Sequence, residues 1–244
     1  MSGKRKNNTP QPVSKQQPAV HQERTYPRFT LAQRWEHALV LLSGLVLLLT
    51  GLPQKYRDWS ISQDLLSTPD RVELIRNIHH IAAIVLALEA VYHIGRIMYL
   101  MAKRRLPGDL LPTWQDVRDA GHMFQYLLFL RSDKPKFGRY NFEQKVTYWF
   151  IFFGFLIMGI SGFIIWFPIF FTNFLPGGVV PAAKMAHSTE AVVAAIFIVV
   201  WHVYHVHVER TNLSMFTGRL SEKEMREFHE KEYERLTGQP GGRK

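Results

Sequence analysis

Long apolar segments alternate with polar, charged connections along the 244-residue chain. The apolar segments cover approximately residues 31–52, 75–101, 147–171 and 182–208. A helix needs about 20 apolar residues to cross the roughly 30 Å hydrocarbon core of a bilayer, and each segment is long enough. The pattern therefore predicts an all-α protein, an integral membrane four-helix bundle.

Two further helices are expected outside the membrane. Residues 113–130 mix apolar side chains with charges, which predicts an interfacial amphipathic helix. Ser221 and Glu224 form a capping box, so a charged helix should start there and end near Leu236. Residues 1–25 are rich in Lys, Asn, Gln and Pro, which predicts a disordered cytoplasmic tail. The chain then divides into this tail (1–25), a transmembrane domain (26–220) and a charged C-terminal helix and tail (221–244).

The formal net charge of +10 is distributed by loop. Cations gather in both tails and in the connection between the second and third spans, which carries the basic run 103–105. The connection between the third and fourth spans offers only Lys184. The positive-inside rule thus predicts a protein of the cytoplasmic (inner) membrane with both termini cytoplasmic. Cations sorted in this way favour a lipid surface and give no indication of nucleic-acid binding.

Histidines recur at matched depths in two of the apolar segments. His79 and His93 are fourteen residues apart, and His187 and His202 are fifteen apart. Fourteen residues of α-helix make almost four whole turns and rise about 21 Å, so such histidines share a face near opposite sides of the bilayer. An ionisable side chain in a membrane is costly and normally faces the bundle interior. The spacing therefore predicts two stacked b-type haems, each with two imidazole ligands.

Depth matching pairs His79 with His187 on the outer side. On the inner side, His202 can pair with either His37 or His93, and the sequence leaves both open. A third haem that uses spare histidines, including His207, is a further alternative. The chain has no cysteine, which excludes disulfides, iron–sulfur ligation by this chain and covalent haem attachment.

A cation accompanies the candidate ligands at helical spacing. The pairs are Arg34 with His37, Arg76 with His79, Lys184 with His187, and Arg96 with His93. A residue three positions away lies on the same helix face, here toward the nearer membrane surface. These four cations are therefore candidate partners for haem propionates.

The rival hypothesis is a haem-free membrane transporter or anchor whose histidines and carboxylates bind a metal ion or relay protons. A single metal site needs its ligands within about 2 Å of one ion, that is, at one depth. The spread of the histidines over about 21 Å argues against this alternative.

Several motifs resemble the gamma, or cytochrome b, subunits of membrane-bound formate dehydrogenases and the related hydrogenase and thiosulfate reductase subunits. The likeness covers most of residues 26–220 and rests on Arg76-x-x-His79, Gly138-Arg-Tyr-Asn141-x-x-Gln144-Lys145, His187, Trp201-His202-Val-Tyr204 and Ser214-Met-Phe-Thr-Gly218. The resemblance implies outer ligands at His79 and His187, inner ligands at His37 and His202, and a menaquinone site beside the inner haem that includes Asn141.

Two features depart from that family. Its two ligands in the fourth span are fourteen residues apart, where this chain has fifteen, and His93 with Glu89 are additions.

The expected function is that of a dihaem cytochrome b which transfers electrons between menaquinone or another quinone and a partner redox subunit. The expected partner is an iron–sulfur protein or a multihaem cytochrome c on the outer face. The chain contains no molybdenum, nickel or flavin motif, so it is not expected to be catalytic alone.

Overall fold

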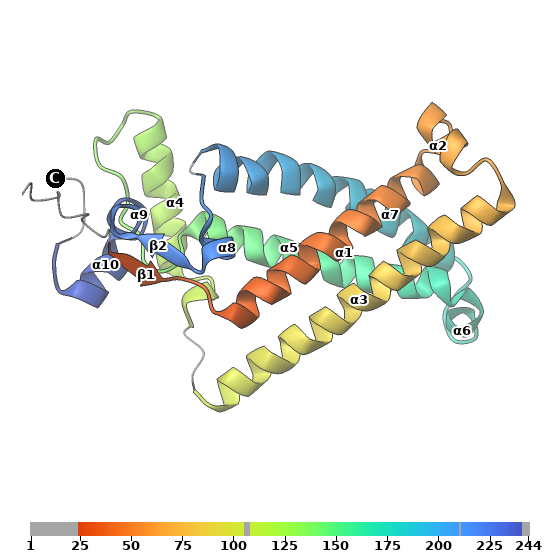
Figure 1. Ribbon diagram of the computed structural model, residues 1–244, viewed down its shortest axis with the longest axis horizontal. Coiled ribbons are helices and arrows are strands. Elements are labelled where there is room, and N and C mark those ends of the chain that lie inside the picture. The colour runs from red at the N-terminus through yellow and green to blue at the C-terminus, as the bar shows by residue number, and fades with distance from the viewer. Residues whose placement is uncertain (1–23, 105–107, 210, 241–244) are drawn as a thin grey trace, which may run out of the picture.

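The computed structural model describes residues 24–104, 108–209 and 211–240. Four long helices lie along the molecule (Figure 1): α1 (Leu31–Lys55), α3 (Pro69–Ala102), α5 (Phe142–Trp166), and α7 (Val179–Phe197), which continues as the π-helix η2 (Ile198–Val208). Each is long and apolar enough to cross a membrane. The predicted all-α membrane bundle is confirmed. The predicted disordered tail and Arg105 lie outside the described residues, except that Thr25 begins a strand.

The four helices form two hairpins. α1 packs along α3, and α5 packs along α7, whereas the two hairpins contact each other at fewer positions, chiefly through α1 and α7. Large apolar side chains cover the outside of both hairpins; Leu42, Leu88 and Ile160 are each more than half exposed. Such a surface is stable in lipid, where helices associate through small and polar residues. Most buried positions in the described spans are accordingly small or polar, as at Ser43, Thr50, Ser161, Ala82 and Ala183, although Ile164 is buried too.

Capping residues set the helix starts and move two of them away from the apolar segments. The third span begins at Phe142 because Asn141 and Gln144 form a capping box. The second span begins at Pro69, where Thr68 caps the helix and proline occupies the first turn. The third span ends at Trp166, before Pro168 opens the short helix α6 (Pro168–Thr172).

Short elements close both ends of the bundle (Figure 1). The connections that contain α2 (Ser60–Leu65) and α6 lie at one end. At the other end lie β1 (Thr25–Pro27), β2 (Arg219–Ser221), η1 (Gly108–Leu110), α4 (Trp114–Leu127), α8 (Ser214–Thr217), α9 (Glu222–Phe228) and α10 (Glu230–Thr237). α4 coincides with the predicted amphipathic helix. Both described ends of the chain therefore lie at the same end of the bundle.

The single charged helix expected after Ser221 is two helices. Ser221 caps α9 and forms the predicted capping box with Glu224. At His229 the backbone leaves the helical region, with φ −138° and ψ 49°, and α10 follows. The Nδ1 atom of His229 lies 3.0 Å from the carbonyl oxygen of Gly138, which anchors the break against the segment before α5.

A small antiparallel sheet pairs the segment that precedes α1 with the segment that follows η2. Thr25 pairs with Ser221, and Pro27 pairs with Arg219. The backbone amides of Arg28 and Phe29, which follow β1, both donate to the carbonyl of Gly218. Gly218 has φ +78°, a left-handed conformation that favours glycine after the short helix α8. Leu220, Met225 and Tyr233 form the core beside this sheet.

Ion pairs and hydrogen bonds attach the connection between the second and third spans to the start of α5. Lys145 lies 2.9 Å from the carboxylate of Asp116, and the indole of Trp149 donates to the carbonyl of Leu110. Partial burial would raise the pKa of Asp116, but hydrogen bonds from Lys145 and Thr113 outweigh it and hold that pKa below its usual value. These contacts hold η1 and α4 against the N-terminal end of α5.

We expect Leu220→Ala to open the module formed by β1, β2, α9 and α10 while the four spans stay folded. Leu220 is fully enclosed, and truncating a buried leucine costs about 2–5 kcal/mol. Amide hydrogen exchange in α9 and α10 should accelerate by at least about 30-fold. Leu236→Ala, at a half-exposed leucine in α10, is the matched control and should change exchange little. Equal acceleration in both variants would contradict the assigned core.

Candidate functional site

The predicted outer pair joins the two hairpins. His79 lies on α3 and His187 on α7, and their ring centres are 6.4 Å apart. The ring planes are inclined by 67°, and the two rings come from different hairpins.

The inner pair is formed by His37 and His202. His37 lies near the start of α1 and His202 on η2, and their ring centres are 6.3 Å apart. Of the two partners left open for His202, the structure brings His37 to it.

Both separations fit two imidazoles on opposite sides of one metal ion. A metal-bound imidazole nitrogen lies about 2.0–2.1 Å from the ion and about 1.1 Å from its own ring centre, so two trans imidazoles have centres about 6.3 Å apart. Each histidine pair therefore has the spacing that two imidazole ligands of one metal ion would have.

The π-helix explains how fifteen residues separate His187 from His202 on one face. Fifteen α-helical residues overshoot four whole turns by about 60°. A π-helix with i→i+5 hydrogen bonds turns by only about 82° per residue, so the four steps from Ile198 to His202 recover about 70°. The extra residue relative to the resembling family is thus absorbed in η2, and His202 returns to the face of His187.

Hydroxyl groups determine which nitrogen the outer histidines present. The hydroxyl of Thr50 donates to the carbonyl of Val46, at 2.7 Å, and lies 2.9 Å from the Nδ1 atom of His79. Since its hydrogen is already used, Thr50 accepts from the Nδ1–H of His79. The Nε2 atom of His79 then keeps its lone pair for a metal.

The second hairpin repeats this arrangement. The hydroxyl of Ser161 donates to the carbonyl of Ile157, at 2.6 Å, and lies 3.2 Å from the Nδ1 atom of His187. That Nδ1 atom is also 3.1 Å from the carbonyl oxygen of Met158, which only accepts, so it carries the hydrogen.

Glycines beside these hydroxyls allow the rings to approach. A Cβ atom on Gly51 would lie 3.3 Å from the ring of His79, and one on Gly162 would lie 3.2 Å from the ring of His187. Sequence reasoning missed these supports. The available signal was the matching pair Thr50-Gly51 and Ser161-Gly162, each on the first helix of its hairpin.

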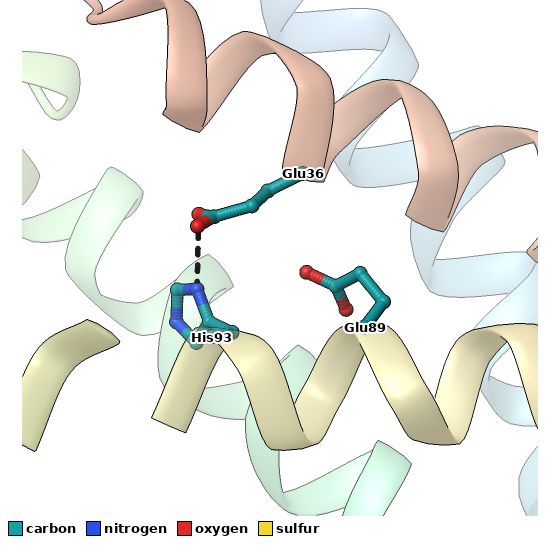
Figure 2. A group of neighbouring side chains, drawn as sticks. All are labelled: Glu36, Glu89 and His93. Atoms are coloured by element: carbon teal, nitrogen blue, oxygen red, sulfur yellow. Dashed lines mark hydrogen bonds and ion pairs between the residues drawn. The ribbon is translucent and has the colours of Figure 1, made fainter. Parts of the chain in front are cut away.

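His93 lies in a separate polar cluster, which we call the Glu36 cluster. It consists of Glu36 on α1, Glu89, His93 and Arg96 on α3, and Tyr148 on α5. Figure 2 shows Glu36, Glu89 and His93. The Nδ1 atom of His93 is 3.1 Å from a carboxylate oxygen of Glu36, and its Nε2 atom is 3.2 Å from the hydroxyl of Tyr148. Both ring nitrogens therefore already have partners in this cluster.

The predicted propionate cations differ in their surroundings. Arg34 donates to the backbone carbonyls of Met215 and Phe216. Arg96 forms a two-pronged ion pair with the carboxylate of Glu36. Arg76 and Lys184 are exposed on the helix turns that precede the two outer histidines.

Asn141 makes no ring contact with either histidine pair, whereas His207 lies close enough to His37 and His202 to interact electrostatically with both. Asn141 is only 2% exposed, and its side-chain oxygen accepts from the amide of Gln144, at 2.8 Å. It therefore caps α5. His207 is exposed on the last turn of η2.

Comparisons with known proteins identify the family of the chain. Residues 28–218 match the family model of prokaryotic cytochrome b561. The chain is 24% identical over 211 residues to the formate dehydrogenase cytochrome b556(fdo) subunit of Escherichia coli strain K12, a match that covers 86% of this chain and 92% of that relative. The corresponding subunits of E. coli O6:H1 (strain CFT073) and O157:H7 match to the same extent.

The matched segment contains all four spans and both histidine pairs, and the resemblance inferred from the sequence motifs is confirmed. Haem b is the prosthetic group that a cytochrome b carries. The chain therefore belongs to the prokaryotic cytochrome b561 family, and it is a membrane-embedded cytochrome b electron-transfer subunit.

Proposed function

We propose that this chain is a dihaem cytochrome b that carries electrons across the membrane between the quinone pool and a partner redox subunit. The observation that carries the proposal is the pair of neighbouring imidazoles at each of two positions along the bundle, with ring centres 6.3 and 6.4 Å apart. His79 and His187 would hold the outer haem, and His37 and His202 the inner one. Haem iron with two imidazole ligands would be six-coordinate, with no position left for a substrate, so such a centre would transfer electrons.

The arrangement of the four paired histidines favours two haems over three. It also favours a haem protein over a transporter that binds a metal ion. A transporter would gather its ligands at one depth, whereas these rings divide into two pairs from four helical segments. His93 contacts Glu36 and Tyr148, and the ring that lies beside His202 is that of His37. We therefore assign His93 no iron.

Charge supports an orientation with both termini in the cytoplasm. The end of the bundle that carries the small sheet also carries α4, α9, α10 and the cations around Lys103. Under the positive-inside rule this end faces the cytoplasm. His37, near the start of α1, then lies on the cytoplasmic side, and the α1–α3 and α5–α7 connections face outward.

The partner and the quinone follow from this orientation. The E. coli relative is named as the cytochrome subunit of a formate dehydrogenase. By analogy, this chain would serve a respiratory oxidoreductase complex, with an iron–sulfur or multihaem cytochrome c subunit at the outer haem and menaquinone or another quinone at the inner one. Asn141, whose side chain caps α5, would support the quinone end by fixing the start of that helix. Arg34, Arg76 and Lys184 remain candidate partners for propionates.

Replacing single ligands should separate the two haems. We expect His79→Ala, His187→Ala, His37→Ala and His202→Ala each to lose one haem of two, because each leaves an iron with one protein ligand. His93→Ala should retain both, since its ring contacts belong to the Glu36 cluster. A pyridine haemochrome assay on the purified chain measures the stoichiometry. Haem loss in His93→Ala with full haem in His37→Ala would overturn the inner assignment.

The π-helix generates a second prediction. Deleting Val199 reduces the spacing of His187 and His202 to fourteen, which a regular α-helix accommodates, so both haems should be retained. Inserting one alanine after Val199 raises the spacing to sixteen and should abolish the inner haem. Haem stoichiometry and absorbance spectra of the two variants test this, and an inverted result would show that η2 does not set the register.

The hydroxyl supports generate a third prediction, for the outer haem. A hydrogen-bonded Nδ1–H makes an imidazole a stronger donor and stabilises the oxidised iron. Thr50→Val should therefore raise the midpoint potential by up to about 40 mV, the equivalent of one hydrogen bond of about 1 kcal/mol in a one-electron couple. Ser161→Ala should have a smaller effect, because His187 keeps the carbonyl of Met158.

Spectroscopic redox titration measures these potentials while the haem content stays at two. Ser43→Ala is the matched control, because Ser43 is a buried hydroxyl on α1 that bonds the carbonyl of Leu39. An equal shift in Ser43→Ala would assign the effect to α1 packing rather than to His79.

A further inference from the structure

The Glu36 cluster contains three groups that ligate metals. Glu36 on α1 and Glu89 and His93 on α3 each offer one ligand atom, and these atoms lie within 4.8 Å of one another. Figure 2 shows the side chain of Glu36 extending from α1 toward α3, which carries Glu89 and His93. The two helices thus present a nitrogen and two carboxylates to one small region.

Glu89 has no direct polar partner in that region. It is 8% exposed, and within the described residues it receives no hydrogen bond and forms no ion pair at 4 Å or less. Burying a carboxylate without a partner is costly, and most buried polar groups are satisfied. An unsatisfied carboxylate beside two other ligand groups indicates that the site takes a further ligand.

The charge of the cluster favours a cation as that ligand. Arg96 balances the carboxylate of Glu36, which leaves the charge of Glu89 in excess. Each carboxylate oxygen has two acceptor positions, so the Oε2 atom of Glu36 can bond Arg96 and still face a second partner. That second position is directed at His93, whose Nδ1 atom lies 3.1 Å away.

The geometry points to a site for a transition-metal dication, Zn²⁺ in particular, ligated by Glu36, Glu89 and the Nδ1 atom of His93. Bonds of about 2.0–2.1 Å in a tetrahedral site place neighbouring ligand atoms about 3.3 Å apart, close to the observed separation of Glu36 and His93. One imidazole with two carboxylates is a donor set that suits zinc, whereas calcium and magnesium prefer oxygen alone. Three protein ligands leave the fourth position for water.

Tyr148 is positioned to support this site. Its hydroxyl lies 3.2 Å from the Nε2 atom of His93. A hydroxyl can donate or accept, so it can bond His93 when the imidazole hydrogen is on Nδ1, and equally when Nδ1 binds zinc and the hydrogen is on Nε2. Groups that bond the second nitrogen of a ligating histidine typically strengthen metal binding. Zinc at this site would tie α1 to α3 one residue away from the inner ligand His37.

Zinc binding to the purified, haem-loaded chain tests the site. Equilibrium dialysis against Zn²⁺ should find one tight site per chain. Glu89→Gln and His93→Ala should weaken it at least tenfold, and Tyr148→Phe by about 10-fold or more. Zinc-edge X-ray absorption should show a single imidazole among nitrogen and oxygen ligands.

Matched variants keep the test independent of folding and of the proposed function. Glu190→Gln removes another carboxylate of the spans, on α7 and outside the cluster, and should leave zinc affinity unchanged. Haem stoichiometry in every variant reports folding and the dihaem proposal separately. No tight zinc site in the wild type, unchanged affinity in Glu89→Gln, or two imidazoles at the zinc would each overturn the site.

Discussion

Two imidazole rings that share one ion must keep their centres about 6.3 Å apart, and this spacing has to be held between two helical hairpins rather than within one. In the outer pair, glycines at 51 and 162 give each ring its room, and the adjoining hydroxyls of Thr50 and Ser161 fix each ring's hydrogen on Nδ1. The sparse direct packing between the hairpins follows from the same requirement, because the ring pairs bridge them.

The molecule combines two kinds of interior. In the spans, most buried side chains are small or polar, as at Ser43, Thr50 and Ala183, and most large apolar groups face outward to lipid. At the end that carries the sheet, Leu220, Met225 and Tyr233 form an ordinary apolar core. This module holds the segments that flank α1 and η2, so it fixes where the helices that carry His37 and His202 enter the bundle.

Periodicity could predict the spans and the outer pair, because depth and helix face follow from 3.6 residues per turn alone. The same arithmetic could not choose between His37 and His93, which lie on two helices at a similar depth; the choice depends on which ring Glu36 and Tyr148 engage. That periodicity also assumes a regular α-helix, so it could not predict the π-helix η2. Strands of three residues and the break at His229 leave too little pattern in the sequence to be recognised.

Neighbouring residues on one turn of α1 link the two polar sites. Successive helical residues point about 100° apart, so His37 can face His202 across the hairpins while Glu36 faces α3. Arg96 holds the carboxylate of Glu36 and thereby limits the rotation of this turn. Of the two residues that depart from the resembling family, His93 contacts the same carboxylate of Glu36 and so adds to this restraint, while Glu89 lies beside it. His93 and the π-helix thus act at the same end of the bundle: His93 restrains the turn of α1 that carries His37, and η2 brings His202 to His37.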